Sequence, residues 1–396
     1  MTARSLIDAG LPEPDADSVA HSHRVAAYLC DRMSKSGGSI SFAEFMHEAL
    51  YAPGLGYYSA GAAKLGRDGD FVTAPEISPL FGYVLARQIA RVLGQLDGGD
   101  VLEPGAGSGA LAVSMLRKLG ELGALPERYQ ILEVSADLRD RQKTRLAAEI
   151  PQLIDRVQWI EQMPDEFSGV IVANEVADAM PVERFRIRED ELEQQRVACA
   201  DDRFVWQHAA APPPLQRAIR EVETDIGRSL EDGYVSEVSL WLTSWIGQLS
   251  RCVTRGMILL FDYGVSRHEY YAADRDAGWL RCQFRHRTHD DPLILPGIQD
   301  LSAWVDFTAV ATAAVAEGME VAGYTTQAGF LLHGGLEQEL ADFAELPIQQ
   351  QVQLSAKVKW LTLPAEMGEN FKCIGLCRGD VEPLPAYRGA DMTHLL

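Results

Sequence analysis

The 396-residue sequence lacks several features that mark whole classes of protein. Its six cysteines form no C-x-x-C pair, which argues against a zinc ribbon and a disulfide framework, so we expect reduced thiols. No apolar run reaches the roughly 18 residues of a membrane span. Only 36 lysines and arginines stand against 57 acidic residues, and the net charge of −21 would repel nucleic-acid phosphates. This charge favours a cationic or arginine-bearing protein as partner.

The first residues also lack the pattern of a targeting segment. Acidic residues such as Asp8, Glu13 and Asp15 interrupt the apolar stretch that a signal peptide needs. They equally contradict the acid-poor composition of an organelle transit peptide. We therefore expect a cytoplasmic protein.

Residues 101–109 join an apolar strand to a helix through alternating glycines, in the pattern E-x-G-x-G-x-G. Glycine lets a backbone turn tightly and approach a ligand with no Cβ in the way. A dinucleotide site would show G-x-G-x-x-G, whose glycines bring a pyrophosphate onto the helix N-terminus. The alternating form points instead to S-adenosylmethionine, which has no phosphate, held by Glu103, Gly105, Ala106 and Gly107. The alternative is a plain glycine-rich turn.

A second carboxylate, Glu133, follows the mostly apolar strand residues 130–132 and precedes a new helix. A carboxylate can accept two hydrogen bonds from the vicinal hydroxyls of a ribose. The carboxyl end of the second strand in a βαβ unit is where open α/β sheets bind such ligands. We therefore assign Glu133 and its neighbour Val134 to the cofactor site. The alternative for Glu133 is an acid that stabilises the start of a helix.

Residues 51–58 and 66–76 are rich in glycine, aromatic and polar residues, and the loop over residues 69–78 is expected to close over the cofactor. Thr73 and Glu76 are its predicted polar contacts, and Pro75 fixes the backbone. Glu76 is a candidate partner for the cofactor's ammonium group. It could equally be an acid in the first turn of a helix that begins after Pro75.

Strand and helix patterns alternate from about residue 100 to 173 and resume after residue 238, which predicts an α/β fold with a parallel sheet. Two late strands match the antiparallel hairpin of a class I methyltransferase, a Rossmann-like sheet in the order 3-2-1-4-5-7-6. Residues 1–78 form an amino-terminal helical segment and covering loop. The S-adenosylmethionine-binding core comprises residues 79–184, 236–264 and 305–380. Residues 185–235 and 265–304 are insertions, predicted to form a lobe for substrate binding or dimerisation.

Together, nine segments make the chain resemble the MidA-type methyltransferases, in its bacterial-like branch. The family includes a mitochondrial complex I assembly-factor arginine methyltransferase. The segments appear in family order: residues 69–76, 103–109, 133–135, 174–182, 262–264, 291–292, 296–297, 305–308 and 366–372. Ser108 stands where the mitochondrial branch typically carries an arginine in or near the turn, and Pro104 replaces a small or apolar residue. The resemblance implies methyl transfer from S-adenosylmethionine to nitrogen, most simply to an arginine of a protein.

Asn174, Glu175 and Asp178 follow the apolar strand 170–173 and should emerge at the carboxyl edge of the sheet. An arginine side chain stays protonated, so its methylation needs carboxylates that clamp the guanidinium and aim one nitrogen at the methyl carbon. Glu175 is the first choice for that clamp and Asp178 the second. Asn174 could bond the amino-acid end of the cofactor or a substrate amide. The alternatives are helix-capping acids for the two carboxylates and an ordinary strand-end residue for Asn174.

Four further residues are candidate substrate contacts. Asp262 ends the strand 257–261 at the same edge, as a support or merely a strand-end cap. The resemblance makes Glu366 and Glu369 substrate contacts, although they could only solvate a turn. His286 lies in an irregular loop with a possible gating role. His286, His289, Asp290 and Asp291 also invite a metal interpretation, but the neighbouring arginines disfavour it, and we expect no metal.

The sequence thus predicts an S-adenosylmethionine-dependent N-methyltransferase whose substrate is an arginine-bearing protein, in one version a respiratory-complex subunit. A homodimer is a further possibility. The rivals are a small-molecule methyltransferase, an RNA methyltransferase that the charge disfavours, a cofactor-binding assembly chaperone without catalysis, and a nicotinamide oxidoreductase that the glycine spacing disfavours.

Overall fold

The computed structural model describes residues 10–59, 73–201 and 203–396. The chain divides into two compact units, each built from three separate stretches. The described residues of the first unit are 10–59, 178–201, 203–243 and 267–304, and those of the second are 73–177, 244–266 and 305–396. The boundary near residue 243 falls within α9 (Leu240–Cys252).

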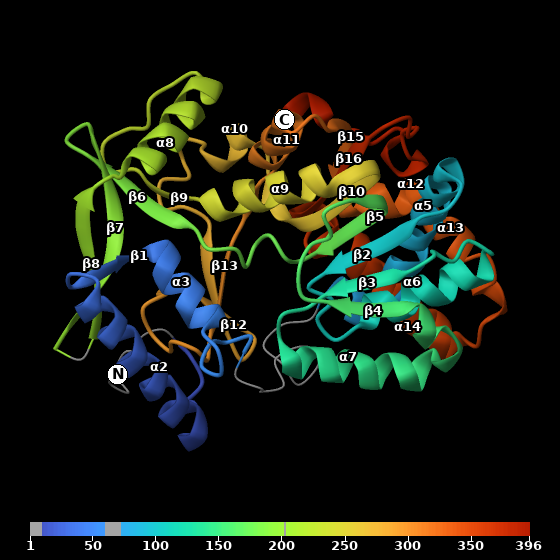
Figure 1. Cartoon of the computed structure of the whole chain (residues 1–396), viewed down its shortest axis with the longest axis horizontal. Coiled ribbons are helices and arrows are strands. Elements are labelled where there is room, and N and C mark those ends of the chain that lie inside the picture. Colours follow the sequence, from blue (N-terminus) through green and yellow to red (C-terminus); the bar gives the residue numbers. More distant parts are fainter. Residues whose placement is uncertain (1–9, 60–72, 202) are drawn as a thin grey trace. The chain divides into compact units, whose positions relative to one another are not determined.

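The second unit is built on a sheet in which seven strands follow one another in the predicted order 3-2-1-4-5-7-6 (Figure 1). From one edge to the other the strands are β4 (Val157–Ile160), β3 (Tyr129–Leu132), β2 (Asp100–Pro104), β5 (Phe167–Asn174), β10 (Val253–Val265), β16 (Phe371–Arg378) and β15 (Glu320–Thr326). The first five run parallel, and β16 is antiparallel to both of its neighbours. A short strand, β14 (Val305–Asp306), also pairs with β10. The α/β class and the class I methyltransferase sheet order are therefore confirmed.

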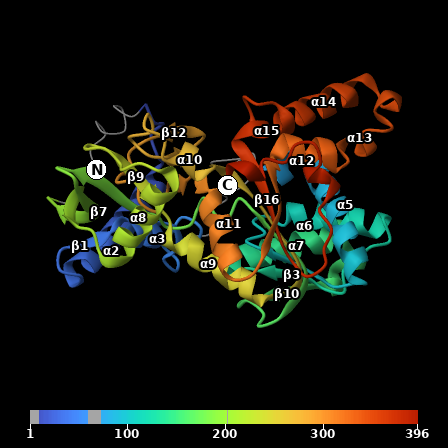
Figure 2. The same cartoon turned by 90° about the horizontal axis from the view of Figure 1, so that it is seen from above.

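Helices connect these strands much as the apolar periodicity predicted. They are α4 (Ala74–Ile77), α5 (Pro79–Leu96), α6 (Ala110–Glu121), α7 (Ala136–Glu149), α11 (Phe307–Ala316), α12 (Gln327–Gly334), α13 (Leu336–Glu339), α14 (Ile348–Thr362) and α15 (Met367–Asn370). Short 3-10 turns cover Pro151–Arg156, Phe343–Glu345, Pro385–Tyr387 and Thr393–Leu395. Figure 2 shows α12, α13, α14 and α15 gathered together, in agreement with their mutual contacts.

An aromatic cluster lies in the core of the second unit. The Phe261 ring, in β10, lies 5.2 Å from Phe81 and 4.9 Å from Phe330, both in edge-to-face geometry. All three side chains are fully buried. Because edge-to-face aromatic pairs add to the free energy gained by burial, this cluster stabilises the contact between the sheet and helices α5 and α12.

The first unit contains an antiparallel sheet that the sequence did not predict. Its strands are β1 (Ser39–Ser41), β7 (Glu191–Ala200), β6 (Glu183–Arg188) and β9 (Val235–Val238), with β8 (Arg203–Ala210) also paired to β7. A separate three-stranded sheet consists of β12 (Arg287–His289), β11 (Leu280–Phe284) and β13 (Asp300–Ala303). The helices are α2 (Ala16–Lys35), α3 (Phe42–Tyr51), α8 (Pro213–Ile226) and α10 (Arg267–Tyr270).

At the start of α3, in the first unit, the local sequence pattern and the structure agree. Ser41 and Glu44 form a capping box at the start of α3, with Ser41 Oγ accepting a hydrogen bond from the Glu44 backbone N–H at 3.1 Å. Strand β1, however, pairs with β7, so part of the segment predicted as helical belongs to a sheet shared with residues predicted as an insertion. That pairing spans about 160 residues of chain, and no local pattern carries such a signal.

The expectation of six reduced thiols is wrong for two of them. Cys30, in α2, and Cys199, in β7, form a disulfide with their Cα atoms 5.6 Å apart. Their sequence separation of 169 residues explains the error, because short-range spacing motifs cannot reveal such a pair. The other four cysteines are free and buried.

Candidate active site

The glycine turn lies at the carboxyl end of β2 and leads into α6. Gly105, Gly107 and Gly109 have φ angles of +66°, +53° and +82°, in the left-handed region. A Cβ on Gly109 would lie 2.8 Å from Leu146 Cδ1, and one on Gly105 would lie 3.2 Å from Val176 Cγ2. All three positions therefore favour glycine for their conformation, Gly105 and Gly109 also for space, and the turn can bring bare backbone against a ligand. Ala106, between the first two, is buried.

Glu103 precedes this turn and is buried within the sheet. Its Oε2 atom accepts a hydrogen bond from the Tyr129 hydroxyl at 2.5 Å. Burial raises the pKa of Glu103 to about 7, the Tyr129 hydrogen bond opposes that rise, and the nearby Glu133 charge adds to it. Tyr129 was not predicted, because an aromatic residue at the start of a strand looks like ordinary core.

Glu133 lies directly after β3 and is held from two sides. Its Oε1 accepts from the backbone N–H of Ser135 at 2.9 Å, and its Oε2 accepts from Gln142 Nε2 at 3.0 Å. Burial raises the pKa of Glu133, and these two hydrogen bonds oppose the rise. The next side chain, Val134, is 78% exposed and offers an apolar surface at the sheet edge. Both placements suit the predicted adenosine contacts.

Gln142 is a residue that the sequence interpretation missed. It is fully buried in α7, and its Nε2 donates both to Glu133 and to the Gly107 carbonyl, the latter at 2.9 Å. Its Oε1 accepts from Trp159 Nε1 at 3.0 Å. One amide thus fixes the glycine turn and the Glu133 carboxylate together. The available signal was a polar residue one turn before the buried Leu146, on the otherwise polar helix 136–149.

Glu76 has two protein partners in this structure, and its contact with the cofactor's ammonium group stays a prediction. It lies in the short helix α4, and its Oε1 accepts hydrogen bonds from Ser108 Oγ and from Arg145 Nη1, the latter at 2.9 Å. Thr73 is the residue before α4 and makes no side-chain capping bond, while Pro75 lies in its first turn. Residues 69–72 of the predicted covering loop lie outside the described residues.

Asn174 and Glu175 end β5 at the same sheet edge. Glu175 adopts a left-handed backbone (φ +53°), an uncommon conformation for a residue with a side chain and one that is often found at functional sites. Its Oε1 accepts from Asn174 Nδ2 at 3.0 Å and from the Ala74 backbone at 3.3 Å. The Oδ1 atom of Asn174 is buried and finds no hydrogen-bond partner among the described residues. A hydrogen-bond donor of a bound ligand would satisfy this buried amide oxygen.

Asp262 supports the loop that follows Glu175, which is one of the roles predicted for it, and its substrate contact stays a prediction. It is fully buried, and its Oδ2 accepts from the backbone N–H groups of Val176 and Ala177 at 3.2 and 2.8 Å. Its Oδ1 accepts from the Tyr263 N–H at 2.9 Å. With both oxygens turned to backbone donors, Asp262 fixes the segment that follows Glu175.

The other predicted contacts are spread more widely. Asp178 and His286 belong to the first unit. His286 is exposed, with φ +60°, in the two-residue turn between β11 and β12, which is a hairpin position. Glu366 and Glu369 are both exposed beside α15, just before β16 in the second unit. The described residues contain no group of three or more His, Cys, Asp or Glu side chains placed to hold a metal ion.

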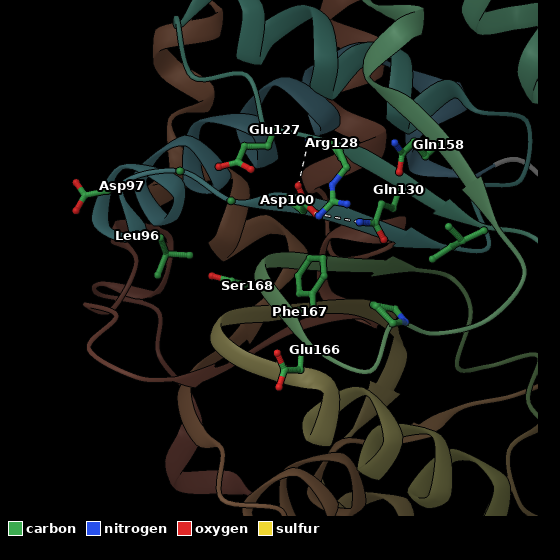
Figure 3. Close-up of a pocket in the computed structure, with 14 residues that line it drawn as sticks. Leu96, Asp97, Asp100, Glu127, Arg128, Gln130, Gln158, Glu166, Phe167 and Ser168 are labelled. Atoms are coloured by element: carbon green, nitrogen blue, oxygen red, sulfur yellow. Dashed lines mark hydrogen bonds and ion pairs between the residues drawn. The ribbon is translucent and has the colours of Figure 1, made fainter.

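A cavity of about 490 Å³ lies in the second unit, at the opposite end of the strands from the glycine turn. It is lined by residues at the starts of β2 and β5, including Asp100 and Phe167 (Figure 3). Asp100 is already bound there by Arg128 at 2.7 Å and by Gln130 Nε2 at 2.9 Å. Since ligands of open α/β sheets bind at the carboxyl ends of the strands, this cavity is not the cofactor site.

The residues at the carboxyl edge fit an adenosyl amino acid in several independent ways. The glycine turn offers close backbone approach, Glu133 offers a fixed carboxylate, Val134 offers an apolar face, and Asn174 offers an unsatisfied acceptor. No helix in the described parts of the chain is long and apolar enough to cross a membrane. Together, the sheet order and this edge define a class I methyltransferase.

Comparison with known proteins agrees. Residues 84–325 match the family model Methyltransf_28, described as an S-adenosyl-L-methionine-dependent methyltransferase. The chain belongs to this family of S-adenosylmethionine-dependent methyltransferases, and S-adenosylmethionine is its cofactor. The MidA-type resemblance is thereby confirmed.

Individual relatives are similar over nearly their whole length. The chain is 30% identical to a mouse protein named "Protein arginine methyltransferase NDUFAF7, mitochondrial", over 95% of this chain and 92% of that one. It is 28% identical to the Drosophila melanogaster homologue of that name, over 93% and 88%. A COG1565 superfamily member from Burkholderia thailandensis, solved bound to S-adenosyl-homocysteine, is 38% identical with a TM-score of 0.91, covering 98% of this chain and 100% of that one.

Proposed function

We propose that this methyltransferase modifies an arginine nitrogen of a protein substrate, and that Glu175 holds the acceptor guanidinium. One observation carries the proposal. The carboxylate of Glu175, a residue with a left-handed backbone directly after β5, lies beside the amide of Asn174, whose Oδ1 has no hydrogen-bond partner among the described residues. The mouse and Drosophila melanogaster relatives are named as protein arginine methyltransferases, which supports it.

The chemistry explains why a carboxylate is needed there. S-adenosylmethionine supplies an electrophilic methyl group on a sulfonium, and an N–CH₃ bond forms as the S–CH₃ bond breaks in line with it. The acceptor guanidinium is positively charged at neutral pH and has no freely available lone pair. Glu175 would bond two of its N–H groups, localise the charge and leave the third nitrogen aimed at the methyl carbon. One proton leaves the product, and the same carboxylate is placed to accept it.

The surrounding residues hold Glu175 in place for this task. Asn174 and the Ala74 N–H both donate hydrogen bonds to its Oε1. Asp262 anchors the next two backbone N–H groups, so the loop cannot relax away from the sheet edge without losing those bonds. Asp178 stays the predicted second carboxylate, three residues further along the chain.

The experiment is a labelled methyl-transfer assay. Purified protein and tritiated S-adenosylmethionine are incubated with lysate from cells that lack the gene, followed by gel separation and acid hydrolysis of labelled bands. Label recovered as methylarginine would support the proposal, and Glu175→Gln should abolish that label while retaining cofactor binding. Label on a small molecule, or tight cofactor binding with no transfer at all, would overturn it in favour of a small-molecule enzyme or an assembly chaperone.

Three further expectations from the sequence stay predictions. A substrate among respiratory-complex subunits would appear as the mass of the labelled band in the same assay. A homodimer would appear in sedimentation at micromolar concentration. A cytoplasmic location would appear on fractionation of cells that express a tagged chain.

A further inference from the structure

The first unit carries a stack of aromatic rings that neither the cofactor site nor the sheet explains. Trp241, at the start of α9, stacks on His47 with ring centroids 4.9 Å apart, and His47 lies 5.7 Å from Tyr51. Tyr51 in turn stacks on Tyr58 at 5.4 Å. We name these four residues the aromatic ladder. It joins the helix α3 to the loop that follows it.

The ladder reaches the protein surface, unlike the aromatic core beside it. The Trp241 side chain is 45% exposed, and His47, Tyr51 and Tyr58 are half-buried. Tyr57, which packs edge-on against Tyr58 at 5.1 Å, is by contrast fully buried in the hydrophobic core of the unit. The stack therefore ends in a tryptophan with nearly half of its surface in water.

Two carboxylates of the same unit lie at the inner end of the ladder. Asp300 Oδ1 accepts a hydrogen bond from the Tyr58 hydroxyl at 2.9 Å. The Tyr51 hydroxyl donates to the carbonyl of Ala179 at 3.0 Å, which brings this ring next to Asp178 in the chain. Burial raises the pKa of Tyr58 well above its ordinary value, and the negative charges of Asp300 and Asp178 add to that rise. Negative potential therefore accompanies the ring faces.

Aromatic faces combined with carboxylates form an environment for a planar cation. A guanidinium stacks flat on aromatic rings, is less strongly hydrated than an ammonium group, and forms paired hydrogen bonds to carboxylates. The net charge of −21 would draw cationic segments toward the protein in general. The ladder would then bind segments that carry a planar guanidinium more tightly than segments that carry an ammonium group.

We propose that the aromatic ladder, with Asp178 and Asp300, binds arginine side chains of the protein substrate. This inference rests on the proposed function and names the feature by which the substrate is recognised: a segment with more than one exposed arginine. One arginine would lie on the exposed surface of Trp241, and its neighbours would be drawn toward the carboxylates. The ladder is a recognition surface, distinct from the Glu175 clamp that acts on the reacting nitrogen.

The test uses short acetylated peptides of alternating glycine and arginine, titrated into the full-length protein in a calorimeter. Matched peptides carry lysine, or the neutral planar analogue citrulline, in place of arginine. The arginine peptide should bind tighter than the lysine peptide, and the citrulline peptide should not bind measurably. Trp241→Leu should weaken arginine-peptide binding by about 5- to 30-fold, the amount that one well-placed cation–π contact provides, whereas Trp241→Phe should retain most of the affinity.

The chain supplies a matched control in Trp360 of α14, which belongs to the second unit and is 46% exposed. Trp360→Leu makes the same chemical change at the same exposure and should leave peptide affinity unchanged. All variants should bind the cofactor as the unaltered protein does, which shows that they are folded. Equal binding of the arginine and citrulline peptides, or equal effects of the two tryptophan variants, would overturn the proposal.

The outcomes separate this inference from the proposed function. Methylarginine formation in the labelled assay without arginine-peptide binding would overturn the ladder and leave the activity standing. Peptide binding that depends on Trp241, with no methylarginine formed from any lysate, would overturn the activity and leave a cation-binding surface. With a methylated protein substrate in hand, Trp241→Leu should raise KM and leave kcat unchanged, and a fall in kcat alone would contradict a docking role.

Discussion

The substitution Glu133→Gln tests the cofactor site most directly. It replaces a carboxylate by an amide of nearly the same shape in a side chain that is held by Ser135 and Gln142. Gln142 cannot turn its own amide around to compensate without losing its bonds to the Gly107 carbonyl and to Trp159. One of the two donors that face Glu133 would therefore meet an NH₂ group in the variant.

The expected loss of affinity follows from the hydrogen bonds involved. A ribose diol would donate two bonds to the ionised carboxylate, and a hydrogen bond to a charged group contributes about 1.5–3 kcal/mol. The amide keeps one acceptor and loses the charge, so the loss should be about 2–4 kcal/mol, equivalent to about 30- to 1000-fold in Kd. Titration calorimetry with S-adenosyl-homocysteine measures this directly, since that ligand undergoes no turnover.

Glu161→Gln is the matched control. Glu161 is exposed and forms an ion pair with Arg139 at 2.9 Å, an interaction of a kind that contributes about 0–1 kcal/mol to stability. Its substitution should leave the Kd for S-adenosyl-homocysteine within about twofold. If Glu133→Gln also stayed within that range, the ribose assignment would be wrong, and the carboxylate would serve only to order the turn before α7.

Three other perturbations test the structure around the site. Glu103→Gln should flatten the pH dependence of stability, because folding raises the pKa of Glu103 from 4.5 to about 7 and the folded protein therefore binds more protons than the unfolded chain between these values. In urea unfolding, the stability of the parent should fall as pH rises from 4.5 to about 7, and that of the variant should not. Asp262→Asn should lower kcat more than cofactor affinity, because it turns an amide donor toward backbone N–H groups of the loop after Glu175, and unchanged kcat would contradict the support role. Phe261→Ala should reduce the free energy of unfolding by about 3–5 kcal/mol, and a loss below about 1 kcal/mol would mean that the aromatic cluster repacks.

The second unit was predictable because its signals are local and repeated. The glycine turn, the capping positions and the apolar runs each specify a few residues, and their alternation specifies a parallel sheet. Helix α7 and strand β4, for example, lie within the stretch from about residue 100 to 173 in which the sequence predicts alternating strands and helices.

What escaped prediction depends on distant partners. The side chain of Glu76 meets Arg145, 69 residues away along the chain, and the sequence offered no way to choose between that arginine and a ligand's ammonium. Asp262 looked like a candidate substrate contact because strand-end acids often bind ligands, yet its partners are backbone groups 85 and 86 residues earlier. The partners of buried polar groups are set by the packed fold, which a single sequence does not display.

The disulfide between Cys30 and Cys199 closes a covalent ring that contains strands β2, β3, β4 and β5. These four strands of the methyltransferase sheet belong to the second unit, whereas the two cysteines that close the ring belong to the first. A single backbone cut anywhere between these cysteines would leave both fragments linked, and the nick would appear on a gel only after reduction. In the chain-entropy description, a ring of this size removes about 5 kcal/mol of freedom from the unfolded chain. The redox potential of its surroundings would thus determine whether this enzyme keeps the covalent link and the stability that the link contributes.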